Sequence, residues 1–274
     1  MSAHAPQQIT ERSCPACTQA ETKPLPYGNE QWPVAQCAIC GFVYLTKAPV
    51  YERLSEEFAW EQTSEAERLV REEREPVKQS ISRALKTFRR EVLKRDKLGD
   101  LMKAFVPSGK VLDIGCAGGG FLANLPAQYT PYGIEISKQL SMKAASIVEP
   151  RGGTITHENA FNGVRALPAN LFDCVVMSSF LEHEVEPSGL LEGIERILAP
   201  GGVVIIKVPN FASWNRHLRA DKWCGFRLPD HVNYFTPASL KHLIEHNGLT
   251  VEQFGWKDRH PFSDNMWLVA GKAA

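Results

Sequence analysis

The chain has 274 residues, of which 43% are hydrophobic and 23% are charged, and its 31 basic and 31 acidic side chains leave no net charge at pH 7. This length holds one sizeable domain and a small one, and the composition argues against a largely disordered chain. Zero net charge argues against a nucleic-acid-binding surface over the whole molecule, although a local basic patch remains open. The polar N-terminus lacks the apolar core of a signal peptide, and no apolar run approaches the ~20 residues that span a bilayer, so we expect a cytoplasmic protein without membrane contact.

Four cysteines near the N-terminus form two C-x-x-C pairs, Cys14 with Cys17 and Cys37 with Cys40. The pairs are separated by 19 residues, a spacing typical of a tetrahedral zinc site of the zinc-ribbon type. Four protein ligands close the coordination sphere, so the predicted Zn²⁺ is structural. Because roughly 30 residues bury too little surface to fold alone, the metal would supply most of this module's stability. Disulfides, an iron site or no bound metal are the alternatives.

The first 105 residues divide into three predicted segments: a flexible tail at 1–12, a zinc-ribbon module at 13–46 and a charged helical linker or lid at 47–105. Within the linker, Ser64 and Glu67 form a capping box at the start of one helix, and Pro76 ends that helix. A second helix follows with apolar residues at helical spacing and a basic opposite face. We interpret the basic face as solvated, with a lid over the active site and a nucleic-acid contact as alternatives.

The segment from Lys110 to Gly120 reads Lys-Val-Leu-Asp-Ile-Gly-Cys-Ala-Gly-Gly-Gly. It predicts a short apolar strand that ends near the acidic Asp113, a glycine-rich turn and the start of a helix. Glycine lets the backbone approach a ligand closely, and a helix N-terminus offers unpaired N–H donors. The segment is therefore typical of a cradle for a nucleotide-type cofactor.

A second apolar run, from Tyr132 to Ile136, carries Glu135 22 positions after Asp113. A carboxylate at the tip of the second strand is placed to accept hydrogen bonds from ribose hydroxyls, as in dinucleotide sites and S-adenosylmethionine (SAM) sites. Asp113 distinguishes the two kinds of site. It would repel the pyrophosphate of a dinucleotide, whereas it suits the ammonium and sulfonium groups of SAM.

From Gly109 onward, predicted strands alternate with predicted helices. Strands are expected near 110–114, 131–136, 153–156, 172–178, 201–208, 249–255 and 266–271, and helices near 118–125, 137–147 and 188–198. A further helix begins at Thr236, with Pro237 at its first position. This alternation predicts an α/β domain at 106–274, with a parallel sheet whose ligand lies at the carboxyl ends of the strands.

The motifs of this domain resemble those of class I SAM-dependent methyltransferases, and they come in that family's order from Gly109 to Gly271. The stretch Leu181-Glu182-His183 is similar to the family's "LEH" motif, and the run from Leu198 to Gly202 is similar to its "LxPGG" turn. The benzoquinol-methylase-like small-molecule enzymes are the most similar subgroup. The resemblance implies a Rossmann-like sheet that is mostly parallel, with an antiparallel last strand.

The resemblance also implies which residues bind SAM. They are Asp113, Gly115, Cys116, Ala117, Gly119, Glu135, Ile136, Asn159, Ala160 and Ser178. Two of these positions depart from the family pattern. Ala117 stands where the middle glycine is usual, and Asn159 stands where an aspartate often contacts the adenine amino group, a hydrogen bond that an asparagine carbonyl can also accept.

Two histidines are candidates for a general base, because an imidazole titrates near neutral pH. His183 follows the fourth strand of the resembling fold, and His231 lies in a loop that contributes to the substrate pocket in that family. A structural contact is the alternative role for each of them. Aromatic residues of the same loop suit a flat or apolar acceptor, and packing between domains explains them equally well. Its arginines suit an acidic acceptor, although surface charge is the commoner explanation for them.

We therefore predict a SAM-dependent methyltransferase that acts on a small molecule, with oxygen preferred as the acceptor atom over carbon or nitrogen. An RNA methyltransferase, in which the zinc module and the basic helix contact RNA, is the first alternative. A non-catalytic protein that keeps a SAM fold is the second. The zinc module would cap the pocket, or bind a protein partner or a second copy of the chain.

Overall fold

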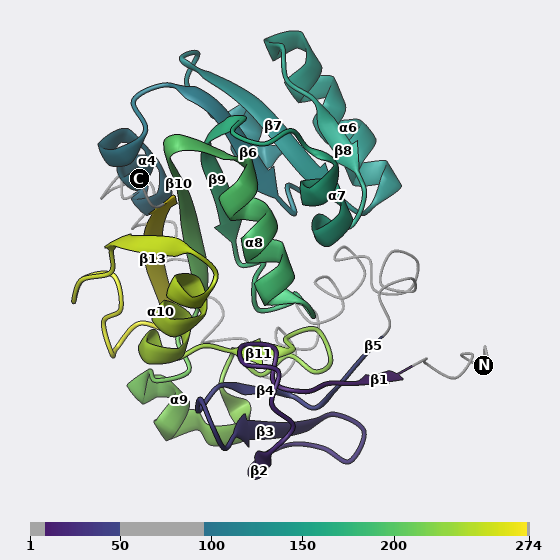
Figure 1. Ribbon diagram of the computed structural model, residues 1–274, viewed down its shortest axis with the longest axis vertical. Helices are drawn as coiled ribbons and strands as arrows, with labels where there is room; N and C mark the ends of the chain where they lie inside the picture. Colours follow the sequence, from purple (N-terminus) through teal and green to yellow (C-terminus); the bar gives the residue numbers. More distant parts are fainter. Residues whose placement is uncertain (1–8, 50–95, 273–274) are drawn as a thin grey trace, which may run out of the picture.

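The computed structural model describes residues 9–49 and 96–272, and the helices predicted between Ser64 and Leu93 lie outside the described residues. The main sheet has seven strands in the order β12-β13-β10-β9-β6-β7-β8 (Figure 1). These are β6 (Gly109–Ile114), β7 (Tyr129–Glu135), β8 (Ile155–His157), β9 (Phe172–Ser178), β10 (Leu198–Pro209), β12 (Leu249–Gln253) and β13 (Asn265–Lys272). Strands β6 to β10 are parallel, whereas β13 pairs antiparallel with both β10 and β12. The predicted Rossmann-like α/β sheet with an antiparallel last strand is confirmed.

Helices cover both faces of this sheet. They are α4 (Lys97–Phe105), α5 (Gly120–Ala123), α6 (Lys138–Val148), α7 (Ala160–Ala166), α8 (Pro187–Ile197), α9 (Trp214–Arg219) and α10 (Pro237–His246), with 3₁₀ turns at Glu149–Arg151 and Ala220–Lys222. Buried residues of α7, α8 and α10 share one core cluster with Val175 and Met177 of β9. Buried residues of α4, α5 and α6 share another with Cys174 and Val176 of the same strand. Because strand side chains alternate between the faces, the continuous apolar run of β9 supplies both cores.

Local chemistry explains where several elements begin and end. The helix expected at 118–125 is the shorter α5, because Gly119 adopts a left-handed conformation with φ of 76° just before it. The predicted start of α10 is confirmed, since the Thr236 side chain accepts a hydrogen bond from the backbone N–H of Ser239 in a capping box. The loop at 211–235, for which no element was expected, contains α9 and the two-residue strand β11 (Asn233–Tyr234).

The N-terminal segment forms a second, smaller sheet that includes β11. Its strands are β2 (Thr22–Gly28), β3 (Pro33–Cys37) and β4 (Val43–Leu45), and the order is β11-β4-β3-β2. Strands β1 (Ile9–Glu11) and β5 (Lys47–Pro49) flank the predicted module in the sequence, and they pair with each other as a two-stranded antiparallel sheet. Strand β11 pairs antiparallel with β4, so this sheet joins the N-terminal module to a loop of the main domain.

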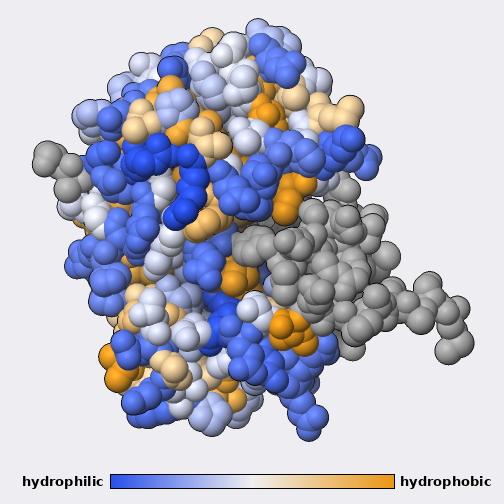
Figure 2. Space-filling view, turned by 45° about the vertical axis from the view of Figure 1, so that its right-hand side comes forward, coloured by the Kyte–Doolittle hydropathy of each residue, from blue (hydrophilic) through white to orange (hydrophobic). Residues whose placement is uncertain are grey.

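The surface shows no extended apolar face in the view of Figure 2, where hydrophobic residues are scattered among hydrophilic ones. Exposed large apolar side chains include Trp214 and Leu218 of α9, and the ring of Trp214 packs against that of the exposed Phe262. Within residues 9–49 and 96–272, none of the helices has the length and apolarity needed to cross a membrane.

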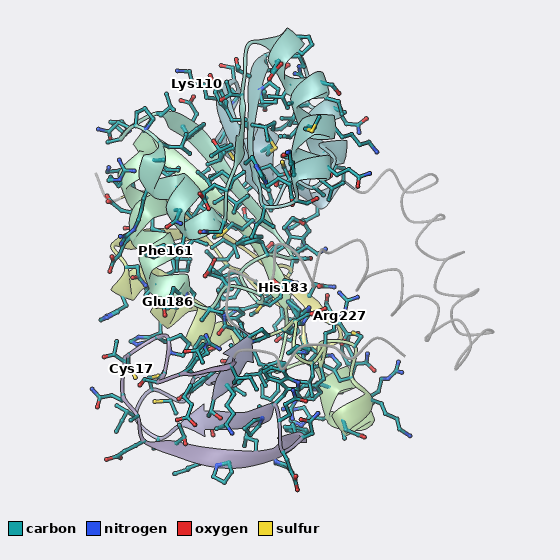
Figure 3. The ribbon with its side chains drawn as sticks, turned by 90° about the vertical axis from the view of Figure 1, so that its right-hand side faces the viewer. Cys17, Lys110, Phe161, His183, Glu186 and Arg227 are labelled. Atoms are coloured by element: carbon teal, nitrogen blue, oxygen red, sulfur yellow. The ribbon has the colours of Figure 1, made fainter. Side chains whose placement is uncertain are left out.

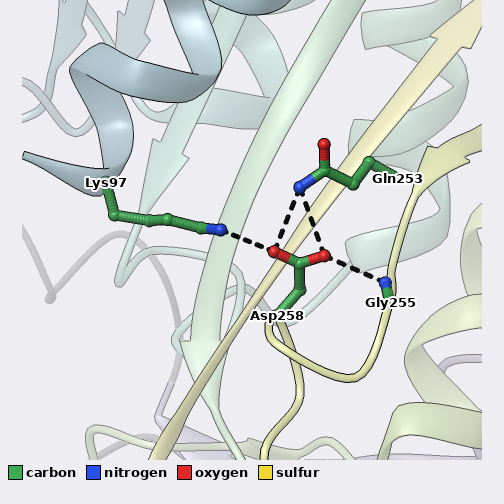
Figure 4. Close-up of polar contacts among 4 residues, drawn as sticks. All are labelled: Lys97, Gln253, Gly255 and Asp258. Carbon is green, nitrogen blue, oxygen red and sulfur yellow. Dashed lines mark hydrogen bonds and ion pairs between the residues drawn. The ribbon is translucent and has the colours of Figure 1, made fainter.

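A buried carboxylate ties α4 to the loop between β12 and β13 (Figure 4). Asp258, which is 5% exposed, accepts hydrogen bonds from Lys97, Gln253 and the backbone N–H of Gly255 at 2.6 to 3.2 Å. Burial alone would raise the pKa of Asp258, but these hydrogen bonds, led by that of Lys97, outweigh burial and lower the pKa.

Replacing Asp258 by asparagine is expected to lower the free energy of unfolding by ~1–3 kcal/mol at pH 7, because buried donors lose a charged acceptor. Urea denaturation of Asp258→Asn and the parent would measure the loss. A carboxyl with a lowered pKa stabilises the fold above its unfolded pKa, and this contribution is lost as pH falls. The difference between the two proteins should therefore shrink in acid. An equal difference at all pH values would contradict this account.

Candidate functional site

The glycine-rich turn between β6 and α5 lies beside the carboxyl end of β7 and is hydrogen-bonded to it. The backbone N–H groups of Gly115 and Cys116 both donate to the carbonyl of Ile134, at 2.9 and 3.2 Å. Gly115, with φ of 72°, has no room for a side chain, since a Cβ there would lie 2.5 Å from a ring carbon of Phe180. Ala117 has φ of 47°, a left-handed conformation that glycine adopts freely and that costs alanine about 1 kcal/mol. The unusual alanine therefore keeps the backbone shape of a glycine turn.

Glu135 is held at the end of β7 by the turn itself. Its two carboxylate oxygens accept hydrogen bonds from the backbone N–H groups of Ala117 and Ser137, both at 2.8 Å. The residue is 7% exposed, so the orientation of its carboxylate is fixed by these donors. Each oxygen keeps a lone pair that a ribose hydroxyl can use.

Asp113 lies near the tip of the neighbouring strand and is also 7% exposed. Burial, followed by the nearby charge of Glu135, raises the pKa of Asp113 to about 8. At pH 7 this carboxyl is thus mostly neutral and would become charged beside a cation. A buried acid next to a fixed carboxylate fits the ammonium and ribose groups of SAM.

The remaining predicted cofactor residues lie at the same sheet edge, because the parallel strands end there. Cys116 is buried, and its sulfur packs so closely on Gly133 that a Cβ at Gly133 would lie 2.6 Å from it. Ile136 is half-buried, and its carbonyl lies 3.0 Å from Nε2 of His157. Other predicted positions are the left-handed Gly119, the buried Ala160 at the start of α7 and the exposed Ser178 at the end of β9.

Asn159 has a role in the fold at this edge. It is the N-cap of α7, and its side-chain oxygen accepts a hydrogen bond from the backbone N–H of Asn162 at 2.9 Å. Its side-chain amide donates to Glu158 at 2.8 Å. The second lone pair of the oxygen remains the acceptor that an adenine amino group would require.

Replacing Asp113 by asparagine is expected to weaken SAM binding at least tenfold, or about 1.4 kcal/mol. In the parent, Asp113 with a pKa of about 8 must lose its proton to hold an ammonium group, so binding at pH 7 should release close to one proton and strengthen as pH rises toward 8. Calorimetry in two buffers of different ionisation enthalpy measures both quantities. An unchanged affinity, or the same proton release in Asp113→Asn, would refute the assignment.

The two predicted histidines, which are 48 positions apart in the sequence, lie side by side. The rings of His183 and His231 are 4.6 Å apart between centroids and nearly perpendicular. The ligand-type atoms of both rings and of Glu182 all lie within 4.8 Å of one another. Figure 3 shows His183 and Arg227 close together between the main sheet and the N-terminal module.

Backbone carbonyls fix the tautomer of both rings. Nδ1 of His183 lies 2.9 Å from the carbonyl of Asp230, and Nδ1 of His231 lies 2.8 Å from the carbonyl of Gly225. Because a carbonyl only accepts, each Nδ1 carries a proton, so in the neutral form of either ring the lone pair is on Nε2. Burial, followed by the charge of Arg227, lowers the pKa of His183 to about 4, so this ring is neutral at pH 7.

Glu182 was not singled out as a functional residue, although it is adjacent to His183. It is 1% exposed, and within the described residues its Oε2 atom has no hydrogen-bond partner. Burial raises the pKa of Glu182 to about 8, against the smaller opposing effects of its own backbone N–H, Lys207 and Arg227. At pH 7 a mostly protonated carboxyl therefore lies beside the neutral imidazole of His183.

The histidine loop meets the cofactor turn through Phe180. The ring of Phe180 packs against Gly115, and the carbonyl of the same residue accepts the backbone N–H of His183 at 2.9 Å. Phe180 therefore connects the cofactor turn to the segment that holds His183.

Several aromatic residues expected near an acceptor instead pack the N-terminal module against the main domain. Trp223 and Tyr234 are buried in one cluster with Val34 and Leu45 of the module, and Phe235 packs edge-on against Phe42. Arg216 donates to the hydroxyl of Tyr27 at 3.0 Å and to the carbonyl of Phe211 at 2.8 Å. Packing between domains, the alternative role for these residues, accounts for them.

The four N-terminal cysteines converge. Sulfur atoms of Cys14 and Cys40, and of Cys17 and Cys37, are 3.5 Å apart, and all four lie within 4.8 Å of one another. Zinc–sulfur bonds of ~2.3 Å in a tetrahedron place sulfurs about 3.8 Å apart, so the cluster fits a tetrahedral metal ion. Each C-x-x-C turn closes in the same way. The residue after each pair, Thr18 or Gly41, donates its N–H to the carbonyl of the pair's first cysteine.

Three features together define a class I SAM-dependent methyltransferase. They are the strand order of the sheet, the buried acids at the ends of two neighbouring strands, and the glycine turn between those acids. The profile of a methyltransferase-domain family matches residues 79–253, well over half of the chain. The chain therefore belongs to the methyltransferase-domain family and is a SAM-dependent methyltransferase.

Curated relatives include three enzymes named ubiquinone biosynthesis O-methyltransferase. The protein from Psychrobacter arcticus is 27% identical over 173 residues, which cover 58% of this chain and 66% of the relative. The proteins from Thiobacillus denitrificans and Psychrobacter cryohalolentis are 28% and 32% identical over 169 and 173 residues, covering 56% and 58% of this chain and 70% and 66% of the relatives. The chain thus spans about two thirds of the length of these relatives.

Solved structures confirm the fold. A SAM-dependent methyltransferase from Archaeoglobus fulgidus has a TM-score of 0.52 at 19% identity, covering 67% of this chain and 94% of that one. The PH0226 protein from Pyrococcus horikoshii has a TM-score of 0.50 at 19% identity, covering 64% of this chain and 88% of that one.

Proposed function

We propose that the chain transfers the methyl group of SAM to a hydroxyl oxygen of a small molecule, with a phenol as the favoured class. The observation that carries the proposal is the contact of Phe180 with Gly115, which joins the cofactor cradle to the paired rings of His183 and His231. The relatives support oxygen as the acceptor atom, since their names describe O-methyltransferases. Carbon and nitrogen are the less favoured acceptors.

In this proposal, Asp113 binds the ammonium group of SAM and Glu135 binds its ribose hydroxyls. SAM supplies an electrophilic methyl group on its sulfonium when bound. The chain must hold the acceptor oxygen in line with that methyl and keep water out. The left-handed backbone of the turn lets the ligand approach the peptide groups closely.

His231 is proposed as the general base and His183 as its neighbour at the acceptor oxygen. A hydroxyl loses its proton as its oxygen gains the methyl group, and the Nε2 lone pair of His231 is suited to take that proton. The positive charge that His231 gains is stabilised by the Gly225 carbonyl on Nδ1, 2.8 Å away. His183, with a pKa of about 4, stays neutral beside it and can accept a hydrogen bond from the acceptor.

The cysteine cluster is proposed to bind Zn²⁺ in a structural site within the module at 13–46. The supporting observations are the sulfur spacings and the four-thiolate donor set, which suits zinc in a closed tetrahedral site. A cytoplasmic location and a protein partner or second copy at this module remain predictions.

Methyl transfer from isotope-labelled SAM tests the proposed function. The acceptors would be a panel of phenols and catechols, with total RNA as the competing class. The expected product is a methyl ether, identified by mass spectrometry and NMR, together with S-adenosylhomocysteine. Label found only in RNA would favour the first alternative. SAM binding without methylation of any acceptor would favour the non-catalytic alternative.

A further inference from the structure

Both loops that carry the histidine pair are fastened to the N-terminal module. Strand β11 begins two residues after His231 and pairs with β4 of the module. The backbone N–H of Leu45 donates to the carbonyl of Val232 at 2.9 Å, extending this pairing toward His231. Beyond the His183 loop, the hydroxyl of Ser188, in the first turn of α8, donates to the carbonyl of Pro15 at 2.9 Å.

Arg12, two residues before Cys14, donates hydrogen bonds to three segments at once. One guanidinium nitrogen donates to the carbonyls of Leu45 and Val232, at 3.2 and 3.0 Å. The other donates to the carbonyl of Val185 and to the side-chain oxygen of Asn233, at 2.9 and 3.0 Å. The segments it joins are therefore strand β4, the loop after His183 and the loop after His231.

Asn233 continues this network into the His183 loop. It is 1% exposed, and its side-chain amide donates to the carbonyls of Leu181 and Glu184, at 3.1 and 2.6 Å. Its backbone N–H and that of Val232 donate to the carbonyl of Glu182. The segment that holds His183 is thus hydrogen-bonded to the segment that holds His231 on both sides of the histidine.

We propose that Arg12 and Asn233 are positioning residues that hold the rings of His183 and His231 in the relative position that methyl transfer requires. The N-terminal module is then a structural part of the acceptor site. The inference rests on the proposed function of the histidines. Arg12 and Asn233 act on those rings through the backbone, and neither has to touch SAM or the acceptor.

The chemistry of the two side chains suits this role. Arginine presents several donors in one rigid plane and can serve acceptors on separate segments, whereas the ammonium of lysine is a single compact point. The residues whose carbonyls accept hydrogen bonds from Arg12 and Asn233 are buried. Water therefore cannot readily replace a lost donor, and the unpaired carbonyl destabilises the loop. A shift of about 1 Å in either histidine is enough to slow a proton or methyl transfer strongly.

Two substitutions in the full-length, metal-loaded protein test the proposal. Arg12→Lys keeps the positive charge but loses the planar guanidinium with its several donors. Asn233→Asp keeps an acceptor oxygen for Arg12 but loses both amide N–H donors. Each is expected to lower kcat about tenfold, with the Kd for SAM, measured by calorimetry, within about twofold of the parent value. Zinc content, measured by mass spectrometry, should stay at the parent level.

Arg216→Lys is the matched control. Arg216 crosses the same interface through Tyr27, and within the described residues its hydrogen bonds to Phe211 and Tyr27 lie outside the segments 181–185 and 230–233 that hold the two histidines. Its substitution should leave kcat within about twofold of the parent. Imidazole ¹⁵N spectra supply a readout that needs no substrate. The Nδ1–H signals of His183 and His231 should shift or broaden in Arg12→Lys and Asn233→Asp and stay unchanged in Arg216→Lys.

Unchanged kcat and unchanged imidazole signals in both test variants would overturn the proposal. So would a parallel loss of kcat, SAM affinity and zinc, because that pattern means general destabilisation. If the parent methylates none of the acceptors, the proposed function fails, yet the imidazole spectra still decide whether Arg12 and Asn233 position the rings.

Discussion

His231→Asn is expected to lower kcat for methyl transfer at least about a hundredfold, while the Kd for SAM changes less than about twofold. The asparagine amide can still donate to the carbonyl of Gly225, as Nδ1 of the histidine does at 2.8 Å. It has no lone-pair nitrogen to accept a proton. The substitution therefore removes the base while keeping the hydrogen bond that orders the loop.

Initial rates with a saturating phenol acceptor measure the effect, and calorimetry measures SAM binding. His242→Asn is the control, because His242 is an exposed residue of α10 whose ring stacks on His246. It should retain parental turnover. Equal kcat in His231→Asn and the parent would remove His231 from the proposed mechanism.

Cys37→Ser is expected to abolish stoichiometric zinc binding and to lower turnover at least about a hundredfold. Cys37 ends β3 and is 2% exposed, so losing its thiolate opens the metal site and loosens the sheet that carries β4. Because β4 pairs with β11, the disturbance reaches the loop of His231. The cofactor turn lies between β6 and α5 and Glu135 ends β7, both in the main sheet, so the Kd for SAM should change less than about threefold.

Metal analysis, calorimetry and the methylation assay measure the three quantities on one preparation. Cys224→Ser is the matched control, since Cys224 is exposed and lies outside the cluster. It should keep both zinc and turnover. A Cys37→Ser protein that lacks zinc but retains full turnover would separate the module from the acceptor site and contradict the structural coupling.

The arrangement of the proposed cofactor residues could be predicted because its determinants are local in sequence. Asp113 and the glycine turn are contiguous, and Glu135 follows one helix and one strand later. The β-strand order then brings such residues to one edge of the sheet, as the register of β6 with β7 shows. The four cysteines were predictable for the same reason, since each pair occupies one tight turn.

The acceptor half could be predicted only in part. His183 was singled out because it follows a strand, and His231 because it lies in a loop of the predicted substrate pocket. No local sequence pattern shows that the two rings lie side by side. That proximity depends on β11 pairing with β4, residues about 190 positions apart, and on the hydrogen bonds of Arg12. Loop aromatics such as Trp223 suggested a pocket but fill the core between the two sheets, since a bulky apolar side chain suits either place.

A crystal structure of the protein with S-adenosylhomocysteine tests the central claim most directly. We expect the amino group of the ligand beside Asp113, both ribose hydroxyls on Glu135, and the sulfur on the side of the turn that faces His183 and His231. A ligand seated elsewhere, or a nicotinamide nucleotide retained in the cradle in its place, would contradict the assignment.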